Sequence, residues 1–205
     1  MPLILLLGGA RSGKSALAER LATRWDGPVA VVVTAQARDA EMAERIRRHR
    51  AQRPAGWQTI EEPLELEAAL GRAPAGAQVL LDCLTLWVSN LLEQGADDAE
   101  VARRAAEAAA LAARRTAPTL AVSNEVGSGI VPAAPLARRY RDLLGQVNAT
   151  WADAAERSLL LVAGRALPLQ DPVAARATPA ASPPAARDPG PGAAARRDPG
   201  AAAGG

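Results

Sequence analysis

The only lysine of this 205-residue chain, Lys14, lies in a glycine-rich stretch, GGARSGKS at residues 8–15, whose spacing is that of a phosphate-binding loop. Glycine at Gly8 and Gly13 allows positive φ, so that backbone N–H groups can turn toward a polyphosphate. In this pattern the lysine reaches the β- and γ-phosphates, and the Ser15 hydroxyl holds Mg²⁺. The whole loop is therefore predicted to contact a nucleotide, through Gly8, Gly9, Ala10, Arg11, Ser12, Gly13, Lys14 and Ser15.

The flanking sequence has the pattern that such a loop requires. An apolar run of strand length at residues 3–7 precedes the loop, and an alanine- and leucine-rich helical pattern follows it. The N-terminus of that helix favours bound anions. All other basic residues among the 24 are arginines, and a compact ammonium fits between phosphate oxygens better than a planar guanidinium. A chance glycine-rich turn is the alternative interpretation.

A second candidate is Asp82, which ends the apolar run at residues 79–81. A P-loop enzyme needs an acid at such a place to anchor Mg²⁺ and its water shell. The alternative is a helix N-cap, because a helical pattern begins at Leu84. The neighbouring Cys83 is predicted to be a small buried apolar residue rather than a nucleophile, since no histidine is near it in sequence.

The only histidine, His49, lies in an arginine-rich segment. On a helix it shares one stripe with Met42 and Ile46, so the spacing by itself favours a packing histidine. The surrounding basic residues instead favour a polyphosphate site, in which an imidazole could act as a nucleophile; they are Arg45, Arg47, Arg48, Arg50 and Arg53. These arginines could also form a solvated face paired with Glu41 and Glu44.

Composition narrows the class of protein. A single cysteine excludes an intramolecular disulfide and fits a reducing compartment. The net charge is only +2 and there are no phenylalanines, one tyrosine and four tryptophans, which gives no reason to expect nucleic acid as a partner. The N-terminal apolar run is too short for a membrane span or a signal peptide. We therefore expect a cytoplasmic enzyme.

Strand and helix patterns alternate along the chain. Uniformly apolar runs, typical of strands buried on both faces, occur at residues 3–7, 29–33, 79–81, 120–123 and 159–163. Helical patterns occupy residues 14–25, 39–53, 84–92, 98–115 and 134–155. This order predicts an α/β fold of the P-loop NTPase type, with a mainly parallel, doubly wound sheet flanked by helices. Ligands of such sheets bind beyond the carboxyl ends of the strands.

The end of the chain differs in composition from the rest. Residues 171–205 contain 13 alanines, 7 prolines and 5 glycines. These residues offer too little apolar surface to offset the entropy that the chain loses when it becomes ordered. We therefore expect a domain at residues 1–170 followed by a disordered tail.

Polar residues also end a later apolar run. Asn124 and Glu125 follow residues 120–123 and come just before Gly127. At the carboxyl edge of a sheet they could contact substrate, and a role in capping the turn is the alternative.

Further motifs follow the phosphate loop in order. They are Thr34-Ala35-Gln36, Arg45-Ile46 with His49-Arg50 and Arg53-Pro54, Trp57 with Thr59 and Glu61, Asp82-Cys83-Leu84-Thr85, Ser89-Asn90-Leu91-Leu92, and the stretch from Ser123 to Pro132. Together they resemble the bifunctional adenosylcobinamide kinase / adenosylcobinamide-phosphate guanylyltransferase family of cobalamin assembly. The resemblance covers residues 3 to about 169 and has no counterpart for the tail.

This resemblance implies a two-step enzyme and a set of site residues. Adenosylcobinamide would be phosphorylated by a nucleoside triphosphate such as ATP, and GMP would then pass from GTP to the adenosylcobinamide phosphate through His49. Mg²⁺ would be the cofactor, held at Ser15 and Asp82. By the same analogy the nucleotide contacts extend to Thr34, Ala35, Arg50, Arg53, Glu61 and Asp82.

The role of Glu61 and the class of reaction each have more than one interpretation. Glu61 could accept hydrogen bonds from guanine, or it could simply precede Pro63 at a helix start. The family is expected to be homotrimeric. A simple P-loop kinase without a covalent nucleotide, or a regulatory protein switched by a nucleotide, would carry the same loop.

Overall fold

The computed structural model describes residues 3–172, so the predicted disordered tail lies outside the described residues except for its first two. The elements occur in the order β1 (Leu3–Gly8), α1 (Lys14–Thr23), β2 (Val29–Val33), α2 (Ala40–Gln52), β3 (Gln58–Glu61), α3 (Leu66–Arg72), β4 (Gln78–Asp82), α4 (Leu84–Glu93), α5 (Asp98–Arg114), β5 (Thr119–Asn124), α6 (Pro135–Ala154), β6 (Arg157–Val162) and β7 (Arg165–Leu169). In this part of the chain no helix is both long and apolar enough to cross a membrane.

The described strands form a seven-stranded sheet in the order β3-β2-β4-β5-β1-β6-β7. All neighbouring strands are parallel except β7, which pairs antiparallel with β6. Every residue of β2 is buried, because helices cover a parallel sheet on both faces. The predicted mainly parallel, doubly wound α/β fold is confirmed.

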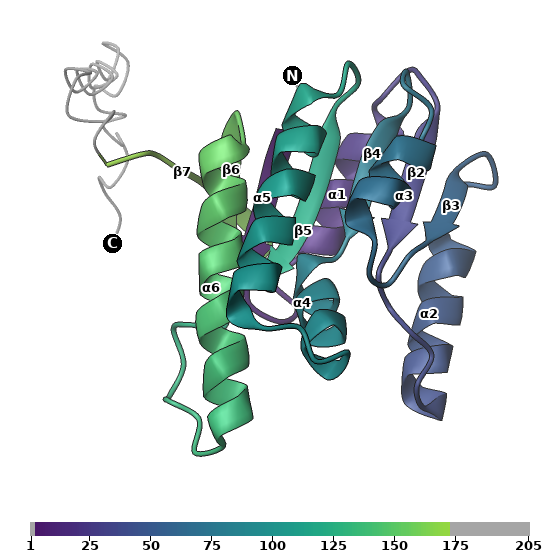
Figure 1. The fold of residues 1–205 in the computed structure, drawn as a ribbon. Coiled ribbons are helices and arrows are strands. Elements are labelled where there is room, and N and C mark those ends of the chain that lie inside the picture. The colour runs from purple at the N-terminus through teal and green to yellow at the C-terminus, as the bar shows by residue number, and fades with distance from the viewer. Residues whose placement is uncertain (1–2, 173–205) are drawn as a thin grey trace, which may run out of the picture. The chain divides into compact units, whose positions relative to one another are not determined.

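The two faces of the sheet carry helix layers of different size (Figure 1). Leu3, Leu5 and Leu7 of β1 point to the core formed with α3, α4, α5 and α6, which includes the fully buried Trp87 and Trp151. Alternate residues such as Leu6 point to a smaller core on the other face, formed with α1. The four-helix layer therefore buries most of the apolar surface.

Helix α2 is held differently from the others. In Figure 1 it lies below β3, beyond the ends of the strands at one side of the sheet, and none of its described residues is buried. Its first turn is capped by Asp39, whose carboxylate accepts the N–H of Met42 at 2.7 Å. Because α2 adds nothing to either core, its position depends on polar contacts and on partly buried side chains.

Two short strands were not predicted from the sequence, and of α3 only a helix start near Pro63 was considered, as the alternative interpretation of Glu61. Strand β3 has only one buried residue, Ile60, and β7 is exposed throughout and contains Pro168, so neither has the apolar run typical of a buried strand. Helix α3 has only seven residues, too few for a clear helical period. All five strands and five helices that the patterns indicated are present, with ends shifted by up to two residues.

The buried Asn90 of α4 connects these elements near the carboxyl edge of the sheet. Its amide nitrogen donates to the carbonyl of Thr34 at 2.8 Å and to that of Pro63 at 3.0 Å, and its oxygen accepts from Arg38 at 2.8 Å. One side chain thus fixes the segments that leave β2 and β3.

We predict that Asn90→Leu will lower the free energy of unfolding by about 1–3 kcal/mol, because two carbonyls lose their donor inside the protein. Urea denaturation measures this change. Ser89→Ala is the matched control, since that hydroxyl makes only a 3.3 Å contact with Glu93. Equal stability of Asn90→Leu and the control would contradict this role.

Candidate active site

The phosphate loop connects the end of β1 to the start of α1, as predicted. Gly8 and Gly13 have φ of 157° and 98°. A Cβ at Gly8 would come within 2.6 Å of both the Ser12 hydroxyl and the Leu161 carbonyl oxygen, so only glycine fits there. Gly13 is in the left-handed region immediately before Lys14, where glycine is favoured.

Lys14 is buried within this loop, and its ammonium donates to the carbonyl oxygen of Gly9 at 2.9 Å. Burial lowers the pKa of Lys14; the nearby Cys83 and Asp82 oppose this shift, and the charge of Arg45 reinforces it. The Ser12 hydroxyl is also buried and has no partner among the described residues. A bound polyphosphate would satisfy both groups.

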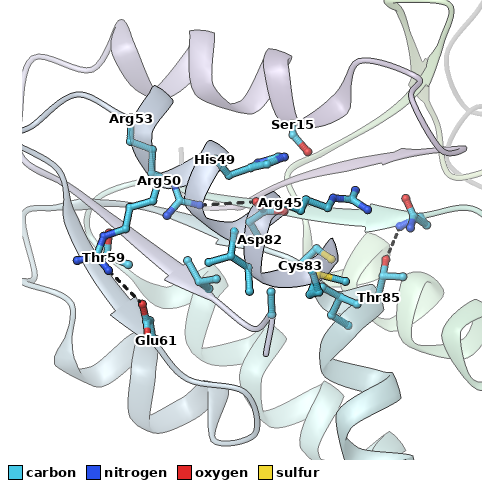
Figure 2. Close-up of a pocket in the computed structure, with 16 residues that line it drawn as sticks. Ser15, Arg45, His49, Arg50, Arg53, Thr59, Glu61, Asp82, Cys83 and Thr85 are labelled. Carbon is cyan, nitrogen blue, oxygen red and sulfur yellow. Dashed lines mark hydrogen bonds and ion pairs between the residues drawn. The ribbon is translucent and has the colours of Figure 1, made fainter. Parts of the chain in front are cut away.

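A small cavity of about 150 Å³ lies where β2, β4 and β5 end (Figure 2). The phosphate loop, the ends of these strands, α2 and β3 all contribute to its wall. The cavity brings together eight of the predicted site residues, namely Ser15, Ala35, His49, Arg50, Arg53, Glu61, Asp82 and Asn124.

His49 faces this cavity together with the two apolar residues of its stripe, Met42 and Ile46. The predicted stripe is therefore correct, but it faces the cavity and not a core, so the expectation of a packing histidine is wrong. Within the described part of the chain, the imidazole forms no hydrogen bond or ion pair. In Figure 2 its ring points toward the side of the cavity where Ser15 lies.

Two arginines of the α2 segment pair with acids across the cavity (Figure 2). Arg53 lies 3.9 Å from Asp82, with side-chain exposures of 7% and 21%, and Arg50 lies 3.7 Å from Glu61, with both side chains exposed. The exposed pair contributes little to stability. Arg53 is nearly enclosed, its Nε has no partner, and its ion pair is long, so it is a cation with unused hydrogen-bonding capacity.

The expected solvated arginine face is present only in part. Arg47 pairs with Glu44 one helical turn away. Arg45, Arg50 and Arg53 instead line the cavity. Different arginines of α2 thus serve different faces.

Two predicted site residues act on the backbone and do not line the cavity. Thr34 is fully buried, and its hydroxyl donates to the Cys83 carbonyl at 2.7 Å and accepts the Cys83 N–H at 2.9 Å. Glu125 accepts the N–H of Gly127 at 2.5 Å, which is the turn-capping role. Thr34 therefore positions the residues that follow Asp82, and Glu125 shapes the loop after β5.

Asp82 and Glu61 do not have the helix-start roles that their positions also allowed. Asp82 does not cap α4, because the N-cap position is Cys83. In the turn before α3 it is Glu62 that accepts the N–H groups of Leu64 and Glu65, while Glu61 lines the cavity.

The prediction that Cys83 is not a nucleophile agrees with its surroundings. Burial, together with the nearby charge of Asp82, raises the pKa of its thiol to about 11. The thiol is therefore uncharged at neutral pH.

Sequence reasoning assigned no role to Thr59 and Thr85 of the cavity wall, whereas Arg45 was among the basic residues expected to favour a polyphosphate. The hydroxyl of Thr85 accepts the N–H of Asn124 at 2.7 Å, which joins α4 to the end of β5. Thr85 could have been identified from the sequence, because it is a polar residue in the first turn of the helix that follows Asp82.

A glycine-rich loop between a buried parallel strand and a helix, with an acid at the end of a second strand, defines a P-loop nucleotide-binding enzyme. The sequence profile described as cobinamide kinase / cobinamide phosphate guanyltransferase matches residues 4–169, and the chain belongs to this family. It is a bifunctional kinase and guanylyltransferase of that class.

Named relatives agree with this assignment. The bifunctional adenosylcobalamin biosynthesis protein CobP of Pseudomonas aeruginosa is 48% identical over 170 residues, which cover 81% of this chain and 96% of the relative. The protein CobU of Escherichia coli, of the same description, is 41% identical over 175 residues, covering 79% and 96%. A solved structure from Pyrococcus horikoshii OT3 is similar in fold alone, with a TM-score of 0.53 and 10% identity over 82% of this chain and 85% of that one.

The burial of Lys14 predicts a pH dependence for nucleotide binding. Affinity for ADP will begin to fall as the pH rises through the lowered pKa of the free protein, below the 10.5 of an ordinary lysine, because the neutral amine cannot pair with phosphate. Cys83 and Tyr140 stay protonated in this range, since burial raises their pKa values to about 11 and about 12.

Calorimetric titration with ADP at increasing pH measures this effect. Lys14→Arg is the control, because a guanidinium keeps its charge throughout the range and should give a flat profile. A wild-type profile that is equally flat up to about pH 10.5 would contradict the prediction.

Proposed function

We propose that this enzyme phosphorylates adenosylcobinamide with a nucleoside triphosphate and then transfers GMP from GTP to the product through a His49–GMP intermediate, giving adenosylcobinamide-GDP and pyrophosphate. The observation that supports this most is that His49 lines the same cavity as Ser15 of the phosphate loop and Asp82. A nucleophile and the groups that bind a triphosphate thus share one space.

In the kinase step the hydroxyl of adenosylcobinamide attacks the γ-phosphorus and loses its proton to solvent, and the bond from that phosphorus to the bridging oxygen breaks to leave a nucleoside diphosphate. Lys14 and the N–H groups of the loop stabilise the charge on the equatorial oxygens. Asp82 can take up a cation, since its nearest partner, Arg53, is 3.9 Å away.

Ser15 and Asp82 fit the role of holding Mg²⁺, because both line the cavity and offer oxygen ligands. Within residues 3–172 no cluster of three or more His, Cys, Asp or Glu side chains is placed to hold a metal, so the triphosphate would supply other oxygens. When bound, the ion neutralises phosphate charge.

In the transfer step an imidazole nitrogen of His49 attacks the α-phosphorus of GTP, and the bond to the β-phosphate oxygen breaks to release pyrophosphate. An oxygen of adenosylcobinamide phosphate then attacks the same phosphorus, which breaks the P–N bond and restores the imidazole. Arg50 and Arg53 flank the cavity and can stabilise the charge on the transferred group. Glu61 can accept hydrogen bonds from N1 and N2 of guanine.

A simple kinase would need no histidine in this cavity, and a nucleotide switch would need no nucleophile. Covalent labelling of the protein by GTP distinguishes both from the guanylyltransferase.

By family resemblance we also propose that the enzyme is a cytoplasmic homotrimer. Sedimentation can test the oligomeric state.

We predict that incubation with GTP labelled at the α-phosphate and Mg²⁺ will give a covalent adduct that is acid-labile and alkali-stable, as a phosphoramidate should be. His49→Asn will remove the label, since an amide cannot replace the imidazole as nucleophile. Autoradiography of the denatured protein measures both. An unlabelled wild type, or equal labelling of the Asn variant, would rule out the histidine intermediate.

The two steps should separate by mutation. His49→Asn should keep phosphorylating cobinamide, because the histidine has no part in attack on the γ-phosphorus, whereas Lys14→Ala should lose both activities by roughly two orders of magnitude or more. Product analysis after each step measures them. An equal loss of the kinase step in the two variants would show that the roles are not separable.

A further inference from the structure

A second cavity, larger than the first, lies along the outer side of α1. Its volume is about 690 Å³, within the range of about 300–1,000 Å³ usual for small-molecule sites. Its wall is formed by the start and exposed side of α1, the segment after α2, and the turn between β6 and β7, through Gly13, Ala16, Glu19, Arg20, Thr23, Arg24, Arg53, Pro54, Trp57 and Gly164.

This cavity begins at the helix end of the phosphate loop. The loop sets the direction of a bound triphosphate, because Lys14 reaches the β- and γ-phosphates while the N–H groups at the start of the helix lie nearer the α-phosphate. The nucleoside therefore leaves the loop past Ser15 and Ala16. Ser15 opens to the first cavity and Ala16 to the second.

During phosphoryl transfer the first cavity, of about 150 Å³, receives the acceptor hydroxyl near Asp82. The donor nucleoside is then better accommodated outside it. The second cavity has more than four times that volume. Because the acceptor occupies the first cavity in this step, the larger second cavity is favoured for the nucleoside of the phosphoryl donor.

The wall of the second cavity has the chemistry for a purine nucleotide. Trp57 offers an indole that is partly buried against the core on the α1 face, and its backbone N–H donates to the carbonyl of Pro54 at 3.1 Å. Arg20 and Arg24 are exposed one helical turn apart and form no ion pair with another described residue. Arg53, nine-tenths buried and with an unpartnered Nε, lines this cavity as well as the first.

The turn between β6 and β7 closes the wall next to the loop. The N–H of Gly164 donates to the carbonyl of Ser12 at 2.9 Å. A Cβ at Gly13 would come within 3.3 Å of the Gly164 Cα, so the two segments are in close contact. The cavity is therefore continuous with the phosphate loop.

We propose that this second cavity binds the base and ribose of the purine triphosphate that donates the γ-phosphate, with the base stacked on Trp57 and Arg20 and Arg24 donating to its ring nitrogens or its α-phosphate. The assignment of the donor to the kinase step rests on the proposed function. It gives the enzyme separate places for the nucleoside of the phosphoryl donor and for the guanine of the transferred GMP.

The test measures ADP binding and His49 labelling in parallel, with the full chain and Mg²⁺. Trp57→Ala and Arg20→Gln/Arg24→Gln are each expected to weaken ADP binding on the order of tenfold, as the loss of base stacking does elsewhere. Thr23→Trp fills the cavity from the exposed side of α1 and should weaken ADP binding at least as much. Arg114→Gln, an exposed arginine at the end of α5 that forms no ion pair with a described residue, is the matched control and should bind normally.

The outcomes distinguish a failure of the second-cavity proposal from a failure of the proposed function. Weaker ADP binding in the cavity variants, with normal binding by the control, supports the second cavity, and it does so even if no corrinoid is phosphorylated. Unchanged ADP binding in both Thr23→Trp and the double arginine variant overturns the inference, even if the wild type forms the His49 adduct and phosphorylates cobinamide. Thr23→Trp keeps the test decisive should Trp57→Ala fail to fold.

Discussion

The site depends on the parallel pairing of β1 with β5 on one side and β6 on the other. In this register the last residue of β1, Gly8, is opposite Asn124 and Leu161, so the phosphate loop begins where two neighbouring strands also end. Pairing of β4 with β5 and β2 carries Asp82 to the same edge. A shift of one residue in any of these pairs would separate groups that must act on one triphosphate.

The parts of the site that could be predicted are those fixed by the local chain. The loop, the acid at the end of β4 and the apolar strands each have a signature within a few residues, and the doubly wound order follows from their alternation. Which face a helix presents was also predictable, as the stripe from Met42 to His49 shows. Whether that stripe faces a core or a cavity could not be predicted, because both give the same spacing of residues along the helix.

Other differences between the predicted and the observed structure arise from tertiary contacts between segments that are distant in sequence. Thr34 was expected to contact a nucleotide, but its hydroxyl bonds with Cys83, which is 49 residues away in sequence. The second cavity combines residues of α1, the turn at Pro54 and the turn at Gly164, which no local pattern connects. Strands β3 and β7 form because a neighbouring strand offers unpaired N–H and C=O groups, although their own apolar content is low.

The enclosed guanidinium of Arg53 belongs to both cavities. One cation cannot give its hydrogen bonds fully to two anions at once, so a ligand that engages it from one side alters the affinity on the other. By thermodynamic linkage the change is equal in both directions. On the proposed assignment of the two cavities, this single side chain would couple their occupancy, and the order in which ligands enter and leave would depend on the binding energies as well as on the sequence of chemical steps.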